Sequence, residues 1–259
     1  MNMPEPQRIS SRENPLLVRL RKLAQDPGAY RKLGEIWLEG DHLCRASRAR
    51  GVPVARALLS ERGWADAGLR ELAAWAPAVT VLPDALFAGI GGLASPAAIG
   101  FVIEAPAAVA PDPQAASVVL DRVQDAGNVG SVLRSAAALG VTQVLALTGT
   151  AGLWSPKVLR AGMGAHFALR LIEGLSADDL AALAVPLVAT SSHTTSVLHQ
   201  VSLPSPCAWV FGHEGQGVSP ALLARCALTV TIPQPGGEES LNVAAAAAIC
   251  LYEAARQKS

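Results

Sequence analysis

The second half of the chain alternates short apolar runs with segments of helical periodicity. Strands as apolar as these are buried on both faces, as in a parallel sheet covered by helices. In such a sheet, ligands bind in the loops that follow the carboxyl ends of the strands. The expected strands lie at 117–123, 142–148, 167–172, 186–190, 207–212 and 229–233, and the expected helices at 130–140, 155–164, 177–184 and 240–257.

The first hundred residues also mix apolar runs with helical stretches. Asn14 and Pro15 supply a cap and a first helical residue for a helix that extends to Gln25. Four apolar runs follow, with helical segments between them. This alternation predicts a small α/β domain. Its expected strands lie at 34–40, 54–60, 79–82 and 98–104.

Three prolines interrupt a stretch of small residues at 105–114, APAAVAPDPQ, as is typical of a linker. We therefore divide the chain into a first domain at 1–105, a linker at 106–115 and a second domain at 116–259.

Composition and charge narrow the function classes. The chain has 259 residues, of which 51% are hydrophobic and only 16% charged, which excludes a disordered protein. The 21 basic residues equal the 21 acidic ones, so the chain is not basic as a whole. The first 50 residues, however, hold 10 basic against 6 acidic residues. A local basic face for nucleic acid therefore remains open.

The four cysteines, Cys44, Cys207, Cys226 and Cys250, are widely spaced. Because none forms a C-x-x-C pair, we expect reduced, buried thiols, with no zinc site and no other metal. The N-terminus lacks the apolar core of a secretory signal. The longest apolar run, Val243–Tyr252, is about half the length of a membrane span. We expect a cytoplasmic protein that does not enter a membrane.

A loop with two glycines follows the first expected strand of the second domain. It runs from Asp125 to Ser131 as DAGNVGS and leads to Arg134. Gly127 and Gly130 permit a ligand to approach the backbone closely. A capped helix that starts near Asn128 and leaves Arg134 in solvent explains the same residues, because a lone G-x-x-G is weak evidence.

A second loop, Phe211–Ser219, places three glycines around Glu214 in the sequence FGHEGQGVS. Glycines at the end of a strand indicate a sharp backbone turn. His213 lies in this loop, but no His or Cys stands at ligand spacing from it. We therefore interpret His213 as an incidental loop histidine.

A third loop, Ile232–Val243, contains two prolines and two glycines in the sequence IPQPGGEESLNV. A rigid loop of this kind leaves backbone N–H and C=O groups free to bind a ligand. We expect Ser240 to cap the last helix. Asn242 then falls in the first turn of an alanine-rich helix, where it has no packing role.

In this order the three loops resemble the SpoU (TrmH) family of RNA ribose 2′-O-methyltransferases. Gly162 stands where the family commonly has Ser, and His213 replaces a usual Asn. The resemblance extends over about residues 117–256, and a weaker one over 9–18 is to the family's ribosomal-protein-like RNA-binding extension. The residues that match the three family patterns are Asn128, Gly130 and Arg134; Gly212, Glu214, Gly217, Val218 and Ser219; and Ile232, Pro233, Gly236, Ser240, Leu241, Asn242, Val243 and Ala244.

The resemblance implies a fold, a cofactor and an assembly. The fold is α/β, with a C-terminal parallel-sheet domain tied in a deep trefoil knot and a small α/β RNA-binding domain before it. The cofactor is S-adenosyl-L-methionine, bound in the knot mainly by backbone groups. The residues at its contact positions are Thr190, Gly212, Ile232 and Leu241. Family members act as dimers, so we expect a homodimer.

The resemblance also implies catalytic roles. Arg134 matches the arginine proposed to assist deprotonation of the ribose 2′-hydroxyl. Arginine is a poor base, since its pKa exceeds about 12. We therefore expect Arg134 to anchor phosphate and to hydrogen-bond the developing alkoxide, with literal proton acceptance left open. The residues expected to orient it and the ribose are Asn128, Glu214, Ser240 and Asn242.

Ribosomal RNA is the expected substrate, because transfer-RNA enzymes of the family often lack an N-terminal domain. A transfer-RNA methyltransferase remains the alternative. Two further functions stay open on the residues alone. One is a non-catalytic RNA-binding or assembly protein. The other is a nucleotide-dependent oxidoreductase, although no strand is followed by G-x-G-x-x-G and an acidic ribose ligand.

Overall fold

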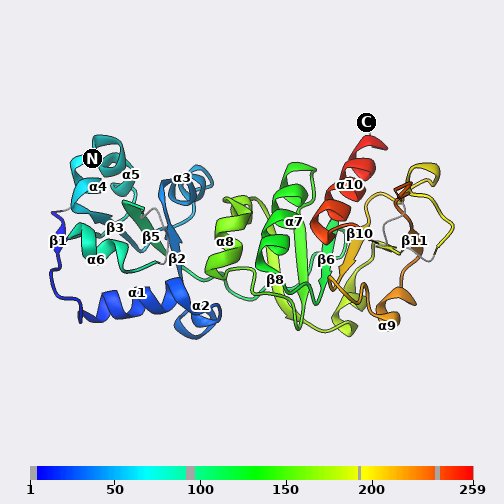
Figure 1. The fold of residues 1–259 in the computed structure, drawn as a ribbon, viewed down its shortest axis with the longest axis horizontal. Helices are drawn as coiled ribbons and strands as arrows, with labels where there is room; N and C mark the ends of the chain where they lie inside the picture. Colours follow the sequence, from blue (N-terminus) through cyan, green and yellow to red (C-terminus); the bar gives the residue numbers. More distant parts are fainter. Residues whose placement is uncertain (1–4, 92–96, 192–193, 237–239, 259) are drawn as a thin grey trace. The chain divides into compact units, whose positions relative to one another are not determined.

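The computed structural model describes residues 5–91, 97–191, 194–236 and 240–258 (Figure 1). The chain forms two compact units. The first comprises Met1–Ala107 together with Trp154–Phe167, and the second comprises Ala108–Leu153 and Ala168–Ser259. The segment Trp154–Phe167, placed by the sequence analysis in the second domain, groups with the first unit because helix α8, Pro156–Gly162, packs on α1 and β2.

The first unit contains a five-stranded sheet of order β1-β4-β3-β5-β2. Strand β5 runs antiparallel to β2 and β3, whereas β1, β3 and β4 are parallel. Asn14 caps α1 through its Oδ1, which accepts the N–H of Leu16 at 3.0 Å, as the sequence predicts. The strands are β1 (Gln7–Arg8), β2 (Glu35–Glu39), β3 (Arg56–Ser60), β4 (Val79–Leu82) and β5 (Ile99–Glu104), and the helices are α1 (Pro15–Gln25), α2 (Ala29–Leu33), α3 (Asp41–Ala49), α4 (Glu61–Ala65), α5 (Ala67–Ala73) and α6 (Asp84–Ala88).

The glycine at position 162 is explained by a buried histidine ring. His166 is 1% exposed, and its ring lies 5.2 Å from that of Trp154 and 6.5 Å from that of Phe167, measured between centroids. A Cβ atom on residue 162 would overlap Cε1 of His166. The imidazole therefore occupies the space that a serine side chain at position 162 would need.

The second unit is built on a six-stranded sheet of order β11-β9-β10-β6-β7-β8. Every pair of neighbouring strands is parallel, which confirms the predicted parallel sheet. Strands β6, β7 and β10 are buried along their whole length. The strands are β6 (Ser117–Asp121), β7 (Gln143–Leu147), β8 (Arg170–Leu175), β9 (Leu187–Thr190), β10 (Ala208–Gly212) and β11 (Leu228–Val230).

Three α-helices accompany this sheet among the described residues: α7 (Ala126–Ala138), α9 (Pro220–Leu223) and α10 (Val243–Arg256). Helix α10 packs on both α7 and β10 (Figure 1). The helix expected at 177–184 is only a 3₁₀ turn, η2 (Asp178–Ala182), and the strand expected at 167–172 is preceded by the 3₁₀ turn η1 (Ala165–Ala168). A third such turn, η3, spans Leu198–Gln200.

All four cysteines are free thiols, and Cys226 alone among them is half-buried rather than buried. Burial raises the pKa of the Cys250 thiol to about 12. Within the described ranges, no helix combines the length and apolarity that crossing a membrane requires.

Candidate active site

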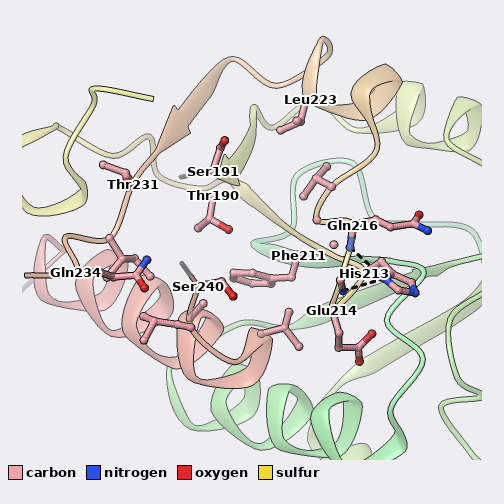
Figure 2. Close-up of a pocket in the computed structure, with 18 residues that line it drawn as sticks. Thr190, Ser191, Phe211, His213, Glu214, Gln216, Leu223, Thr231, Gln234 and Ser240 are labelled. Carbon is pink, nitrogen blue, oxygen red and sulfur yellow. Dashed lines mark hydrogen bonds between the residues drawn. The ribbon is translucent and has the colours of Figure 1, made fainter. Parts of the chain in front are cut away.

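A cavity of about 770 Å³ opens at the carboxyl edge of the second sheet (Figure 2). Its walls come from the ends of β9, β10 and β11 and from the first turns of α10. The side chains of Thr190, Phe211 and Ser240 point into it in Figure 2. All four residues expected at cofactor-contact positions line the cavity, namely Thr190, Gly212, Ile232 and Leu241.

The loop after β10 makes a tight turn that only glycine permits. A Cβ atom on Gly212 would overlap the backbone of Gly217 and Val218. His213 and Gly217 exchange two backbone hydrogen bonds, of 3.0 and 2.8 Å, and Gly217 has a φ of +67°. This close return of the chain leaves the backbone of the loop facing the cavity.

His213 organises this loop. Its Nδ1 accepts the N–H of Gly215 at 3.0 Å and the N–H of Gln216 at 3.2 Å (Figure 2). The interpretation of His213 as an incidental residue therefore missed its role. An Asn, the usual family residue, forms the same kind of bond through its side-chain oxygen in an Asx turn. Because His and Asn can both accept these backbone hydrogen bonds, the replacement of Asn by His was the sign in the sequence that residue 213 supports the loop.

Glu214 joins the second loop to the start of α7. Its Oε1 accepts the N–H of Asp125 at 3.0 Å and the Nδ2 of Asn128 at 3.1 Å, and its Oε2 accepts the N–H of Gln124 at 3.2 Å. Partial burial alone would raise the pKa of Glu214, but the hydrogen bonds from Asn128 and the backbone outweigh it and lower the pKa to about 2. The carboxylate is therefore ionised and lies at the positive end of a helix.

Asn242 completes this network and caps the last helix. Its Nδ2 donates to Oδ1 of Asn128 at 2.9 Å, while its Oδ1 accepts the N–H groups of Ala244 and Ala245 at 2.9 and 3.2 Å. The prediction that Ser240 caps α10 is wrong, because Asn242 occupies the cap. Ser240 lies instead on the cavity wall.

Helix α7 begins one turn earlier than a cap at Asn128 would allow. Asp125 is its cap and accepts the N–H of Asn128 at 2.8 Å. Asn128 is thereby free to use its side chain for Glu214 and Asn242. The structure thus brings together Asn128 from the first turn of α7, Glu214 from the loop after β10 and Asn242 from the cap of α10.

Arg134 lies apart from this network. It is exposed on α7 and makes no hydrogen bond or ion pair with any other described residue. It is also absent from the cavity wall. Its guanidinium remains available to an external anion such as a phosphate.

Two further residues beside the site were not singled out from the sequence. Asp121, at the end of β6, is 3% exposed, and its Oδ2 accepts the N–H of Ser219 at 2.7 Å. Arg122 follows it with a φ of +60° and hydrogen-bonds both Asp121 and Gln216. The one signal in the sequence was a charged pair directly after an apolar strand.

The residues that the structure describes contain no group of three or more His, Cys, Asp or Glu side chains that could hold a metal ion. The cavity wall instead offers backbone groups, hydroxyls and the amide of Gln234. The Oε1 of Gln234 is buried and has no hydrogen-bond partner among the described residues. Together with the carboxylate of Glu214, which also lines the cavity, these groups suit an organic ligand that carries hydrogen-bond donors.

Comparisons with known proteins found a matching family model and similar chains. The sequence model of the SpoU rRNA Methylase family matches residues 115–252. An uncharacterized tRNA/rRNA methyltransferase of Synechocystis is 32% identical over 272 aligned positions, gaps included, which cover 96% of this chain and 94% of that protein. The 23S rRNA (uridine(2479)-2′-O)-methyltransferase of Streptomyces viridochromogenes is 29% identical over 277 aligned positions, covering 98% and 94% of the two chains.

A solved structure is also similar over nearly the whole chain. It is the SpoU methyltransferase AviRb from Streptomyces viridochromogenes in complex with the cofactor AdoMet. The TM-score is 0.86 at 26% sequence identity, and the match covers 95% of this chain and 98% of that one.

Proposed function

The chain belongs to the SpoU rRNA methylase family, and from this premise we propose that it methylates a ribose 2′-hydroxyl of ribosomal RNA. It is an S-adenosylmethionine-dependent RNA methyltransferase, as its relatives and its similarity to an AdoMet-bound SpoU structure indicate. The observation that carries the site assignment is the network of Asn128, Glu214 and Asn242, of which Glu214 lines the cavity.

The cavity suits S-adenosylmethionine on chemical grounds. Gly212 has no room for a side chain, so a ligand there meets bare backbone. The Oε1 of Gln234, which has no hydrogen-bond partner in the described part of the chain, offers an acceptor for an amino or hydroxyl group. Thr190, Ile232 and Leu241 would hold the ligand from the other walls. When bound, the cofactor supplies a methyl group activated by a sulfonium.

The polar network prepares the site for the ribose. The side-chain amide of Asn128 has a fixed orientation, because its Nδ2 donates to Glu214 and its Oδ1 accepts from Asn242. Glu214 is held ionised and already accepts three hydrogen bonds. It orients groups and is not suited to accept a further proton. Ser240 adds a hydroxyl on the cavity wall.

Arg134 is proposed to anchor a phosphate and to stabilise the developing alkoxide of the attacking ribose. Its exposure and lack of a partner among the described residues leave the guanidinium ready for such contacts. Since arginine stays protonated, it acts as a donor in this role. Alignment of the ribose oxygen with the methyl group is then the main source of rate acceleration.

The first unit is proposed to bind the RNA, corresponding to the domain scheme of 1–105, a linker at 106–115 and the methyltransferase domain at 116–259. In support, most basic side chains of its first 50 residues are exposed. Binding through phosphate contacts predicts an affinity that falls steeply with salt. The exposed basic residues are Arg8, Arg12, Arg19, Lys22, Arg31, Lys32, Arg45, Arg48 and Arg50.

The family's trefoil knot and its dimeric state are also proposed for this chain. Helix α10 carries Ile249 and Tyr252 on one face, 40% and 62% exposed. Residues three apart are neighbours on a helix, so these two form an apolar face that a second copy would cover. A monomeric mass by light scattering at full activity would refute the dimer.

A ribosomal-RNA enzyme acts where ribosomes are assembled, so we propose a cytoplasmic location. The decisive experiment maps 2′-O-methylation in ribosomal and transfer RNA from cells with and without the gene. Loss of one ribosomal methyl group, restored by purified protein and S-adenosylmethionine, is the expected result. Loss of a transfer-RNA methyl group would instead identify transfer RNA as the substrate. Loss of none, with RNA binding retained, would favour a non-catalytic assembly protein.

A further inference from the structure

Arg122 holds a backbone conformation that its residue type disfavours. It lies immediately after β6 with a φ of +60°, in the left-handed region. Residues other than glycine adopt this conformation at an energetic cost, which persists only where the surroundings enforce it. Such a residue beside a ligand cavity indicates a function for its position.

Contacts from the loop after β7 enforce the conformation. The backbone N–H of Arg122 donates to Oγ1 of Thr150 at 3.1 Å, and the same hydroxyl donates to the carbonyl of Leu120 at 2.9 Å. Gly149 lies against the aliphatic stem of Arg122, where a Cβ atom would come within 3.1 Å of Cγ. The missing side chain at position 149 thus makes room for the arginine.

The guanidinium of Arg122 connects two groups. Its Nε and Nη2 donate to Asp121 at 2.9 and 3.4 Å, and its Nη1 donates to Oε1 of Gln216 at 3.0 Å. Asp121 in turn accepts the N–H of Ser219 at 2.7 Å. Gln216 and Ser219 lie in the glycine-rich loop that forms one wall of the cavity. Two points of that loop are therefore tied to the end of β6.

We propose that Arg122 is a positioning residue that, together with Asp121, holds the loop His213–Ser219 in the conformation that accepts the cofactor. The loop needs such support because Glu214 through Gly217 are exposed and contain two glycines. Gln216 lines the cavity, but in Figure 2 its side chain is directed away from the cavity centre, and its Oε1 accepts a hydrogen bond from Arg122. The inference rests on the proposed function in that the ligand is taken to be S-adenosylmethionine.

A double-mutant cycle on the purified full chain tests the proposal. Gln216→Ala removes the link to the loop, and Arg122→Lys keeps a positive charge beside Asp121 but loses the planar fork. Each variant is expected to raise the cofactor Kd, measured by calorimetry, about tenfold, as for loss of one hydrogen bond to a charged group. The double variant is expected to bind no more weakly than either single variant, because both break the same link.

Amide hydrogen exchange gives a readout that needs no cofactor. In both single variants the amides of Gly215 and Gly217 are expected to exchange faster, while the thermal unfolding midpoint stays at the wild-type value. Arg170→Lys and Gln200→Ala, at exposed positions of the second unit, serve as controls and are expected to change neither quantity.

Three results would overturn the proposal: unchanged exchange in the loop, a wild-type Kd in either variant, or additive losses in the double variant. Additivity would mean that Gln216 touches the ligand directly. If the wild-type chain binds no S-adenosylmethionine, the proposed function fails, and the amide exchange still decides whether Arg122 holds the loop.

Discussion

The side-chain amide of Asn242 donates a 2.9 Å hydrogen bond to that of Asn128, which joins the N-termini of α10 and α7. Both helices direct their positive ends towards this bond, and the ionised Glu214 accepts from the second functional atom of Asn128. The carboxylate of Glu214, which lines the cavity, thus offsets the positive ends of two helices that meet beside it.

We expect both the stability of the protein and the methylation rate to depend on the carboxylate of Glu214. Glu214→Gln replaces an acceptor oxygen by an NH₂ group that faces backbone donors, so at least one hydrogen bond to the α7 N-terminus is lost. We expect a loss of about 1–3 kcal/mol of stability, the usual penalty for an unsatisfied or mismatched group. The methylation rate should fall at least tenfold. Urea unfolding and single-turnover methylation measure the two effects, with the exposed Glu104→Gln as control.

The pH dependence of this loss follows from the lowered pKa of Glu214. Its folded pKa of about 2 lies below the ordinary value of 4.5. The unfolded chain therefore takes up the proton first as the pH falls, and the stabilisation present above pH 4.5 declines between there and pH 2. The stability difference between wild type and Glu214→Gln should be constant from about pH 5 to 8 and shrink below it. A difference that grows on acidification would contradict the assignment.

Arg134→Ala should abolish methyl transfer and leave cofactor affinity and stability nearly unchanged. The side chain is exposed and has no partner in the described part of the protein, so its removal should cost less than about 0.5 kcal/mol of stability. Arg134→Lys should also be severely impaired, because an ammonium cannot contact ribose and phosphate as a planar fork.

Single-turnover methylation and calorimetry with S-adenosylmethionine measure the two effects of Arg134→Ala. Arg170→Ala, another exposed arginine of the second unit, is the matched control. Wild-type rates in both Arg134 variants would remove this residue from the mechanism. A large loss of cofactor affinity would move it to the cofactor pocket.

The effect of substituting His213 on cofactor affinity should depend on whether the new residue accepts hydrogen bonds. His213→Ala leaves the N–H groups of Gly215 and Gln216 without their acceptor and should weaken cofactor binding several-fold. His213→Asn restores an acceptor and should bind like wild type. Equal losses in the two variants would show that the ring itself, and not its acceptor atom, matters.

Gly162→Ser should destabilise the first unit by about 1–3 kcal/mol, the range for overpacking a filled core. The new Cβ would overlap the ring of His166, which Trp154 and Phe167 confine. His166→Ala opens that space, so the double variant should be more stable than the sum of the two single effects implies. Thermal unfolding of the four proteins completes the cycle, and strict additivity would exclude the contact.

Local sequence patterns predicted the features that depend on residues close together in the sequence. Asn14 before Pro15 predicted the start of α1, and apolar runs bounded by turns predicted the sheets. The end of β10 was expected to turn at its glycines, and Gly212 does so. These residues act through their own backbone or through positions within one turn.

Features that depend on residues far apart in the sequence could not be predicted from it. Ser and Asn are both good helix caps, so Ser240 and Asn242 were both candidates. Asn242 is the residue that caps α10, and its side chain also donates a hydrogen bond to Asn128. The left-handed backbone of Arg122 depends on Thr150, which lies in another loop. The sequence 177–184 has a helical pattern, but only the 3₁₀ turn Asp178–Ala182 forms before Pro186 and the following strand.

The order of strands in the second sheet sets when the enzyme becomes active during its own synthesis. Strand β6 pairs with β10, which is translated much later, and the final wall of the cavity, at Leu241 and the start of α10, is translated later still. Most of the first unit precedes all of these segments. If the cavity holds the methyl donor as proposed, a nascent chain presents its proposed RNA-binding surface before it has a place for that donor, and we expect no RNA modification until α10 has docked on α7.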